Sequence, residues 1–478
     1  MMKIKPPLIK VLLYILFSLP ITAQAMGLSA IAQLAREGAP QLALKLIQLH
    51  QPEFTSNSTA WYEWESQRLQ ILESRGDWQG ILSRSTTHPG QLAGDFLFWR
   101  EQLLVKANLT LRQGVAARER LARLLWAETL PSVSDIQRYR DLIIRSYMVD
   151  AKTEVAHVAM LRYQQDFTGL QETTIFRAEV LLASKRFADA ERILQSLGED
   201  YPSLLMMLTQ LRQGKALNQE QLTKLRWLSS LDEVPVKEQY MAWGIRSEHE
   251  FGSNNLKGAI LAQERLLALV MDENNFFPAR SSRLWQWYQE LAMELANSRQ
   301  LLQGDDQAWI ELATNIYQSE PIESRALYAY IAAESRDAES RETAHKALME
   351  SLIGLNKGEL IVEALYAPVY SQKGEQWPTR VRYFLAERAL NNGDVTGASR
   401  YLLSLDHAPE GEDNIDWNLR RARVLIMAGM VEQGDVVLQH LLAGDRLNGK
   451  QTDKLMQVLF DLQTVRADEQ AIRLFQTL

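Results

Sequence analysis

The chain has 478 residues, of which 46% are hydrophobic, and a formal net charge of −7. This apolar share excludes a wholly disordered chain, and the acidic balance argues against general nucleic-acid binding. Cysteine is absent, which excludes disulfides, thiolate metal sites, a cysteine nucleophile and a lipid-modified cysteine.

Residues 1–25 have the three parts of a secretory signal peptide. Three lysines lie among the first ten residues, an apolar run covers 11–19, and Ala23-Gln24-Ala25 fits a small-x-small cleavage site. The run is shorter than the roughly 20 residues that span a membrane. We expect cleavage, which removes three lysines and lowers the net charge from −7 to −10. We expect no transmembrane segment after cleavage and, in a Gram-negative cell, a periplasmic location.

The stretch 171–202 predicts one helical hairpin. Apolar residues recur every three or four positions on both sides of a turn at Lys185-Arg186, which places them on one face of each helix. Ala178 and Ala190 are small enough for the two helix axes to approach closely, and Phe187 fills the corner beside the turn. A glycine and a proline then end the second helix.

This pattern resembles the tetratricopeptide repeat, which has small residues on both helices, an aromatic residue after the turn and a proline at the end. Ala178, Phe187, Ala190 and Pro202 match that spacing, while Thr174 stands where the family often has a tryptophan. The resemblance implies a stack of helical hairpins that binds protein partners in a groove.

Candidate turns of the same kind recur at steps of mostly about 35–38 residues. A small residue often stands seven positions before and five positions after the turn, although Glu119, Lys257 and Glu363 break the second rule. The interval 252–358 is about three repeats long and lacks clear turns. The candidate turn residues are Gly38, Gly76, Gly114, Asp150, Lys185, Gly214, Gly252, Gly358, Gly393, Gly429 and Arg466.

We therefore predict an all-α fold with little or no β-structure, a right-handed superhelix of about 10–12 stacked antiparallel hairpins. The periodicity breaks at 272–278, which divides the repeats into an N-terminal arm, 26–271, and a C-terminal arm, 279–478. Gly304-Asp305-Asp306 is expected to end the long helix after this break and to cap the next one.

The groove of such a stack is lined mainly by the first helix of each hairpin. Residues just after the small packing position are rotated by about 100° toward it. They are polar, so hydrogen bonds and charge should hold the partner. The predicted partner-binding residues are Glu63, Gln70, Asn108, Glu179, Tyr383, Glu387 and Arg423.

Two features of the N-terminal half allow a second interpretation, direct glycan binding. Nine basic residues oppose five acidic ones between 100 and 145, which could attract an anionic glycan or an acidic partner, or form a solvated face with internal ion pairs. Nearby aromatic rings either stack on sugars or pack between helices. The predicted basic strip is Arg112, Arg118, Arg120 and Arg123; the aromatic residues are Trp61, Tyr62, Trp64, Trp78, Phe96, Phe98, Trp99 and Trp126.

The sequence carries little sign of catalysis. No two of the seven histidines stand three or four residues apart, so no helical metal pair is expected. Phosphate-binding loops, dinucleotide-binding turns and the nucleophile elbow are absent from the sequence. The chain resembles soluble lytic transglycosylases only in its long helical region, since it lacks their Gly-Leu-Met-Gln motif. We predict no catalytic, metal-binding or cofactor-binding residues; a hydrolase with an unrecognised carboxylate pair is a third interpretation.

The resemblance to periplasmic repeat proteins implies a non-enzymatic scaffold or adaptor in a cell-envelope machine, for polysaccharide export, a pilus, a flagellum or cell-wall synthesis. The expected partners are envelope proteins, or a glycan under the alternative interpretation, and nucleic acid is not expected.

Overall fold

The computed structural model describes residues 27–458 except for 37–39, 86–91, 93, 127–131, 168–170, 199, 232, 270–275, 278–280, 374–376, 410, 445–448, 452 and 457. The predicted leader and the candidate turns at Gly38 and Arg466 lie outside the described residues. Throughout the described residues the regular structure is α-helical and no strand is present, which confirms the predicted all-α class.

The chain divides into two compact units. Unit 1 joins the N-terminal part, up to Asp77, to the C-terminal part, from Thr379 onward; unit 2 is Trp78–Pro378. This division differs from the expected arms 26–271 and 279–478. Most of the segment 272–278, where the arms were expected to meet, lies outside the described residues, and the part that is described belongs to unit 2.

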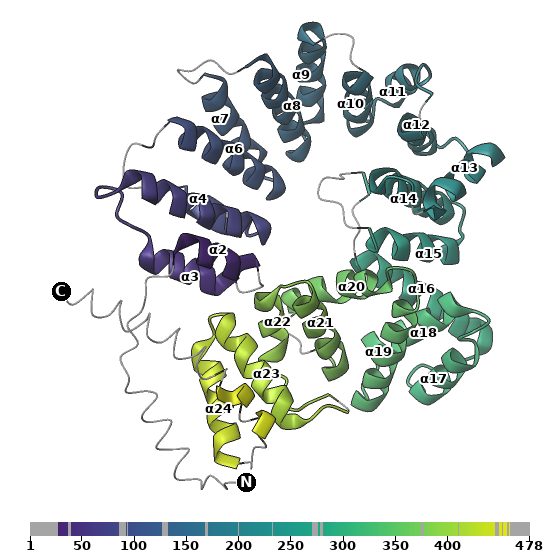
Figure 1. Cartoon of the computed structure of the whole chain (residues 1–478). Coiled ribbons are helices and arrows are strands. Elements are labelled where there is room, and N and C mark those ends of the chain that lie inside the picture. The colour runs from purple at the N-terminus through teal and green to yellow at the C-terminus, as the bar shows by residue number, and fades with distance from the viewer. Residues whose placement is uncertain are drawn as a thin grey trace. The chain divides into compact units, whose positions relative to one another are not determined.

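Unit 1 takes helices from both ends of the chain (Figure 1). Its N-terminal helices pack on one another, its C-terminal helices do the same, and α3 contacts α22. The helices are α2 (Leu28–Arg36), α3 (Pro40–His50), α4 (Ser58–Ser74), α21 (Thr379–Asn391), α22 (Val395–Leu402), α23 (Asn414–Met427) and α24 (Val431–Gly444).

Unit 2 is a series of helices in which most pack on their neighbours in sequence, as a helical-hairpin solenoid requires (Figure 1). They are α5 (Trp78–Ser83), α6 (Gly94–Thr110), α7 (Gly114–Leu125), α8 (Val133–Val149), α9 (Thr153–Asp166), α10 (Gln171–Ala183), α11 (Phe187–Leu194), α12 (Asp200–Arg212), α13 (Gln219–Ser230), α14 (Val236–Gly252), α15 (Leu256–Leu267), α16 (Ser281–Arg299), α17 (Asp306–Asn315), α18 (Pro321–Glu334), α19 (Ala338–Ile353) and α20 (Gly358–Lys373).

One turn geometry recurs inside the hairpins of both units. Lys185 has a left-handed backbone with φ 56°; its N–H donates to the Leu182 carbonyl at 3.1 Å, and the Arg186 N–H donates to the Leu181 carbonyl at 2.9 Å. These two bonds form the Schellman motif, which satisfies the last carbonyls of a helix. A left-handed residue followed by the same six-residue bond occurs at Gly76, Arg112, Ala151, Gly214, Asn254, Gln300, Gly393 and Gly429.

Four turns lie one or two residues from the predicted positions Gly114, Asp150, Gly252 and Gly358. Two of these glycines serve close packing instead of the turn. A Cβ on Gly114 would lie 2.3 Å from the Ser146 carbonyl oxygen, and one on Gly358 would lie 2.0 Å from that of Leu352. The left-handed residues are Arg112, Ala151, Asn254 and Lys357.

The corrected turns restore the rule for small residues at two of its three exceptions; at the third, Val362 stands at the fifth position after Lys357. Glu119 and Lys257 break it only because the predicted turns lie two residues from the actual ones; Ala117 and Ala259 stand at the fifth position after the actual turn and are fully buried. Small side chains at this position let the helices of a hairpin approach. The buried small residues there are Ala117, Ala156, Ala190, Ala259, Ala398 and Gly434.

The interval without clear turns in the sequence is where packing leaves sequence order. There α20 contacts both α15 and α16. Arg265 Nη1 donates to the Asn356 carbonyl at 3.0 Å. Asp305 caps α17 as expected, accepting from the Ala308 N–H at 3.2 Å, but α16 already ends at Arg299 and not at Gly304. In this region unit 2 departs from a strictly sequential stack.

A buried ion pair joins three helices of this region. Arg325 of α18 donates from Nε and Nη2 to the two carboxylate oxygens of Glu264 on α15, both at 2.8 Å. The Tyr288 hydroxyl on α16 donates to the same carboxylate at 2.6 Å. Burial, together with that carboxylate, raises the pKa of Tyr288 well above its ordinary value. The three side chains fix how α15, α16 and α18 pack.

Candidate functional site

The predicted partner-binding residues of the N-terminal half divide into exposed and buried positions. Glu63 and Gln70 are exposed on α4 of unit 1. Asn108 is buried in α6, and its side chain donates to the Leu104 carbonyl of its own helix at 2.8 Å. Glu179 is buried in α10 beside Tyr201, whose hydroxyl donates to it at 2.7 Å. Burial against neighbouring helices leaves Asn108 and Glu179 no open surface for a partner.

The other three predicted residues are half-buried on α21 and α23 of unit 1. The Tyr383 hydroxyl donates to the His407 carbonyl, and its ring lies edge-on to Trp417 at 5.1 Å. Glu387 forms a 2.8 Å ion pair with Arg420. Arg423 lies one turn further along α23. These side chains help to hold the C-terminal hairpins together.

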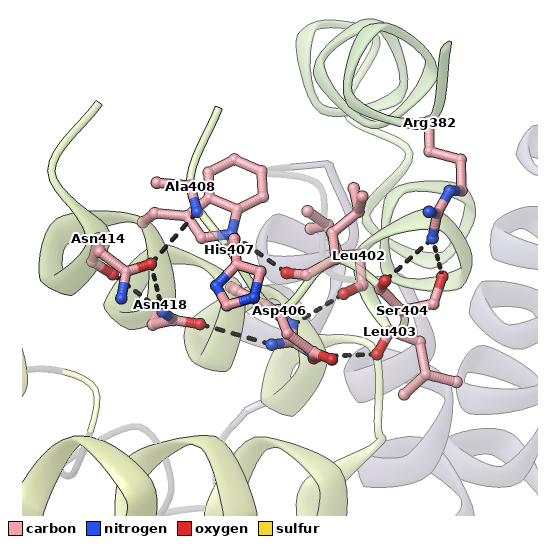
Figure 2. A network of polar contacts seen from close by, with 12 residues as sticks. Arg382, Leu402, Leu403, Ser404, Asp406, His407, Ala408, Asn414 and Asn418 are labelled. Carbon is pink, nitrogen blue, oxygen red and sulfur yellow. Dashed lines mark hydrogen bonds and ion pairs between the residues drawn. The ribbon is translucent and has the colours of Figure 1, made fainter. Parts of the chain in front are cut away.

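The loop between α22 and α23 is held by side chains of α21 and α23 (Figure 2). Arg421 donates to the carbonyls of Leu402 and Leu403, each at 2.8 Å, and pairs with Asp406 at 2.7 Å. Arg382 donates to the Ser404 carbonyl at 2.9 Å. Both guanidinium groups satisfy backbone carbonyls at the end of α22, so their role is structural.

Carboxylates of unit 2 neutralise most of the basic strip. Arg118 pairs with Asp150 at 2.6 Å, and Arg120 and Arg123 share Glu101 at 3.1 and 3.6 Å. Arg112 is exposed in its turn, and among the described residues its guanidinium donates to the Val149 carbonyl, at 3.5 Å. Three of the four arginines therefore form ion pairs between helices of the same unit.

The predicted aromatic residues differ widely in exposure. Trp61 is buried in α4, and Trp64 is half-buried against α2 and α3. Trp126, directly after α7, is 87% exposed. It is the one tryptophan of the predicted group that is clearly open to a ligand among the described residues.

Unit 1 holds a cavity of about 870 Å³ between its N-terminal helices and the turn before α22. We call it the arginine pocket, after the three arginines in its wall, Arg36, Arg75 and Arg400. Arg36 is the last residue of α2, and Arg75 is the C-cap residue of α4. Arg400 lies in the last turn of α22. Uncharged polar residues complete much of the wall; they include Gln67, Gln70, Ser74, Asn392 and Thr396.

The three arginines form no ion pair with any residue in the part of the chain that the structure describes. Arg36 Nε reaches only the Ala32 carbonyl of its own helix, at 3.4 Å. The amide of Gln41, with its oxygen turned toward Arg75, accepts from both terminal nitrogens of that guanidinium at 2.8 Å. No described side chain contacts the guanidinium of Arg400 within hydrogen-bond distance. The pocket therefore gathers positive charge in an acidic chain.

Two further residues of the pocket wall, Asp394 and Thr396, differ in their hydrogen bonding. Asp394 is the acidic residue of the wall, but it caps α22, where its side chain accepts from the Gly397 N–H at 2.8 Å. Thr396 is 9% exposed, and its hydroxyl is buried without a hydrogen-bond partner among the described residues. A buried hydroxyl without a partner costs about 1–3 kcal/mol.

The pocket is suited to binding a polar or anionic group by charge-assisted hydrogen bonds. In the described residues no group of three or more His, Asp or Glu side chains could hold a metal ion, and no helix there is both long and apolar enough to cross a membrane. Sequence reasoning named Gln70 but missed the three arginines. They stand near the ends of helices from opposite ends of the chain, and only the packing of unit 1 unites them.

Comparison with known proteins supports no conclusion about this chain. No family model and no curated protein matches the chain. Among solved structures, one described as Naa15/Naa10 bound to HypK-THB is similar, with 13% sequence identity and a TM-score of 0.30. The match covers 92% of this chain and 66% of that one, so this chain spans less than two-thirds of its length. At this TM-score the likeness carries no argument about function.

Proposed function

We propose that this protein is a non-enzymatic scaffold that binds protein partners. The observation that carries the proposal is the helical-hairpin stacking. Each hairpin buries one side against its neighbours, and repetition leaves an extended surface that suits a protein partner. Exposed polar residues such as Glu63 and Gln70 match a partner held by hydrogen bonds and charge.

The proposed location is the periplasm, and the proposed task is assembly of a cell-envelope machine. The leader-like residues 1–25 support the location, and the resemblance to periplasmic repeat proteins supports the task. Release of the tagged chain by osmotic shock, with loss of the leader detected by mass spectrometry, is the expected result. Retention of an uncleaved chain in the cytoplasm would contradict this location.

Crosslinking in living cells tests the scaffold itself. The chain should recover the same envelope protein with two crosslinkers of different length, and that protein should recover the chain in the reciprocal experiment. An unrelated secreted protein of similar size and net charge is the control. Recovery of no protein above this control would contradict the proposal, as would cleavage of peptidoglycan strands by the purified chain.

Glycan binding is the second candidate, and the exposure of Trp126 favours it. An exposed indole can stack on a sugar ring, whereas Trp61 is buried and cannot. Titration with envelope polysaccharide should then quench tryptophan fluorescence, and Trp126→Ala should remove most of the change. An unchanged signal in the wild-type chain would end this candidate.

A further inference from the structure

Among its described residues, the wall of the arginine pocket carries more positive than negative charge. Three guanidinium groups line it, while the one carboxylate among the described residues of the wall, Asp394, is already used to cap α22. Like charges gathered around a cavity repel one another, and this repulsion is relieved when an anion binds. In a chain of net charge −7, positive charge concentrated in one cavity points to an acidic ligand.

The uncharged part of the wall narrows the class of ligand. Among its described residues the wall contains no aromatic ring on which a sugar could stack. It contains the side-chain amides of Gln67, Gln70 and Asn392, each of which can both donate to and accept from a peptide group. A volume of about 870 Å³ accommodates several side chains of an extended segment. These features favour a peptide over a glycan.

Thr396 gives a second observation, independent of charge. Thr396 is one of the residues that line the pocket and is nine-tenths buried. Its hydroxyl oxygen is buried without a hydrogen-bond partner among the described residues. Buried polar groups normally have hydrogen-bond partners. A bound peptide could supply the missing acceptor or donor after a small rotation of the side chain.

We propose that the arginine pocket binds an acidic segment of a protein partner, with glutamate or aspartate side chains held by Arg36, Arg75 and Arg400. The segment lies extended between the N-terminal helices of unit 1 and the start of α22. This inference rests on the proposed scaffold function and names the chemistry of the partner that the scaffold holds.

The test is fluorescence anisotropy with the full chain and a labelled hexaglutamate peptide, with hexaglutamine as the uncharged probe. Hexaglutamate should bind, and raising the salt concentration from about 50 to about 300 mM should weaken binding severalfold because the contacts are ionic. The triple variant Arg36→Gln, Arg75→Gln, Arg400→Gln should lose at least about tenfold in affinity, since each charge-assisted bond is strong. Thr396→Val should lose a few-fold.

The matched control removes three exposed arginines of unit 2, as Arg162→Gln, Arg192→Gln, Arg226→Gln. It lowers the net charge by the same amount and should change affinity less than about twofold. Equal losses in the two triple variants would overturn the inference, because the peptide would then respond to net charge alone. Failure of the wild-type chain to bind hexaglutamate at millimolar concentration would also overturn it.

Two further arms separate the outcomes. Inorganic phosphate and a sulfated disaccharide should displace the peptide only at far higher concentration; preferential binding of either would replace the peptide with that ligand and overturn the inference. If crosslinking recovers a partner equally well with the pocket variant, the scaffold function is supported and the proposed role of the arginine pocket is wrong. If hexaglutamate binds in the pocket but no protein is recovered from cells, the proposed scaffold function is wrong. Circular dichroism checks the fold of the triple variant, and Arg400→Gln alone replaces it if the triple is unfolded.

Discussion

The basic strip of unit 2 and the arginine pocket of unit 1 each gather arginines, but they treat the charge differently. In the strip, Arg118, Arg120 and Arg123 pair with Asp150 and Glu101 on neighbouring helices. In the pocket, Arg36, Arg75 and Arg400 have no carboxylate partner among the described residues. A count of basic residues therefore does not locate a binding site. What indicates one is whether each basic side chain already has an ion-pair partner within the protein.

The hairpin turns differ between the units as well. In unit 1 the left-handed Schellman residues are the glycines Gly76, Gly393 and Gly429. In unit 2 most of them are not glycine; they are Arg112, Ala151, Lys185, Asn254 and Gln300, with Gly214 the glycine among those described. Residues with a Cβ are disfavoured in this conformation. Unit 2 therefore holds strained turns and internally paired charges, while unit 1 has relaxed turns and unpaired charge in its pocket.

The largest loss of stability is expected when the buried ion pair between Arg325 and Glu264 is broken. Arg325→Met leaves the carboxylate of Glu264 buried without a counter-charge and should destabilise the chain by about 3–5 kcal/mol. Urea unfolding followed by circular dichroism measures the change. Arg162→Met, on an exposed face of α9, is the control and should stay within about 0.5 kcal/mol. A loss below about 1 kcal/mol for Arg325→Met would contradict the buried pairing.

His345 is a buried group in unit 2 with no counter-charge among the described residues, so pH should act on it. The pKa of His345 is lowered to about 4, chiefly by burial; a hydrogen bond with the Ala332 backbone opposes this shift and the nearby Arg341 adds to it. The unfolded chain, with a histidine pKa near 6.5, then binds more protons than the native chain between pH 6.5 and 4. Stability should fall by about 3 kcal/mol as pH falls through this window.

The measurement is the free energy of unfolding at several pH values from 7 to 4. His345→Gln should flatten the pH dependence across that window, because it removes the group that takes up the extra proton. His440→Gln, at an exposed position of α24, should leave the dependence as in the wild type. An unchanged slope in His345→Gln would show that other groups control the acid response.

A smaller effect is expected for a half-buried pair of the basic strip. Arg118 pairs with Asp150 and lies over the Tyr147 ring at 4.3 Å, so Arg118→Gln should cost about 1–2 kcal/mol after allowance for solvent screening. Urea midpoints at low and high salt measure it, and the loss should shrink at high salt. If Arg118→Gln causes no loss of stability at low salt, the ion pair with Asp150 does not stabilise the fold.

The turns should respond to opposite substitutions with opposite signs. Gly429 has φ 85°, and open space surrounds the point where a methyl group would stand, so Gly429→Ala should destabilise unit 1 by about 1 kcal/mol through backbone strain alone. Ala151 has φ 56°, so Ala151→Gly should stabilise unit 2 by about 0.5–1 kcal/mol. Thermal melting of both variants checks the signs, and two changes of the same sign would refute the account of the turns.

Much of the fold could be predicted because it depends on local rules. The hairpin at Lys185 follows from helical periodicity and a short turn, and Ala178 and Ala190 are fully buried as their size requires. Pro202, expected to end the second helix, instead lies in the first turn of α12, and α11 ends at Leu194. Three predicted turns are one or two residues off because each prediction relies on a nearby glycine; of these glycines, Gly114 and Gly358 serve close packing. The contact of α20 with α15 and α16 could not be predicted, since no local pattern specifies packing between distant helices.

The candidate site shows the same limit. Gln70 was predicted from its position on the first helix, but the prediction for Asn108 used the same rule and that residue is buried. Whether a helix face is open depends on the next helix, which spacing alone does not reveal. Arg75 and Arg400 are more than 300 residues apart in the sequence and come together only because unit 1 joins the two ends of the chain.

The smallest change in stability is expected for Arg400→Gln in the arginine pocket. This variant also tests directly whether Arg400 is needed for the fold. Arg400→Gln breaks no ion pair to a described residue, so the free energy of unfolding should change by less than about 0.5 kcal/mol. Relief of repulsion from Arg36 and Arg75 should make the sign neutral or slightly stabilising, and more so at low salt. Urea unfolding beside Arg118→Gln makes the comparison direct. If Arg400→Gln lowers the free energy of unfolding as much as Arg118→Gln does, Arg400 stabilises the fold through its charge, as the ion-paired arginines of the basic strip do.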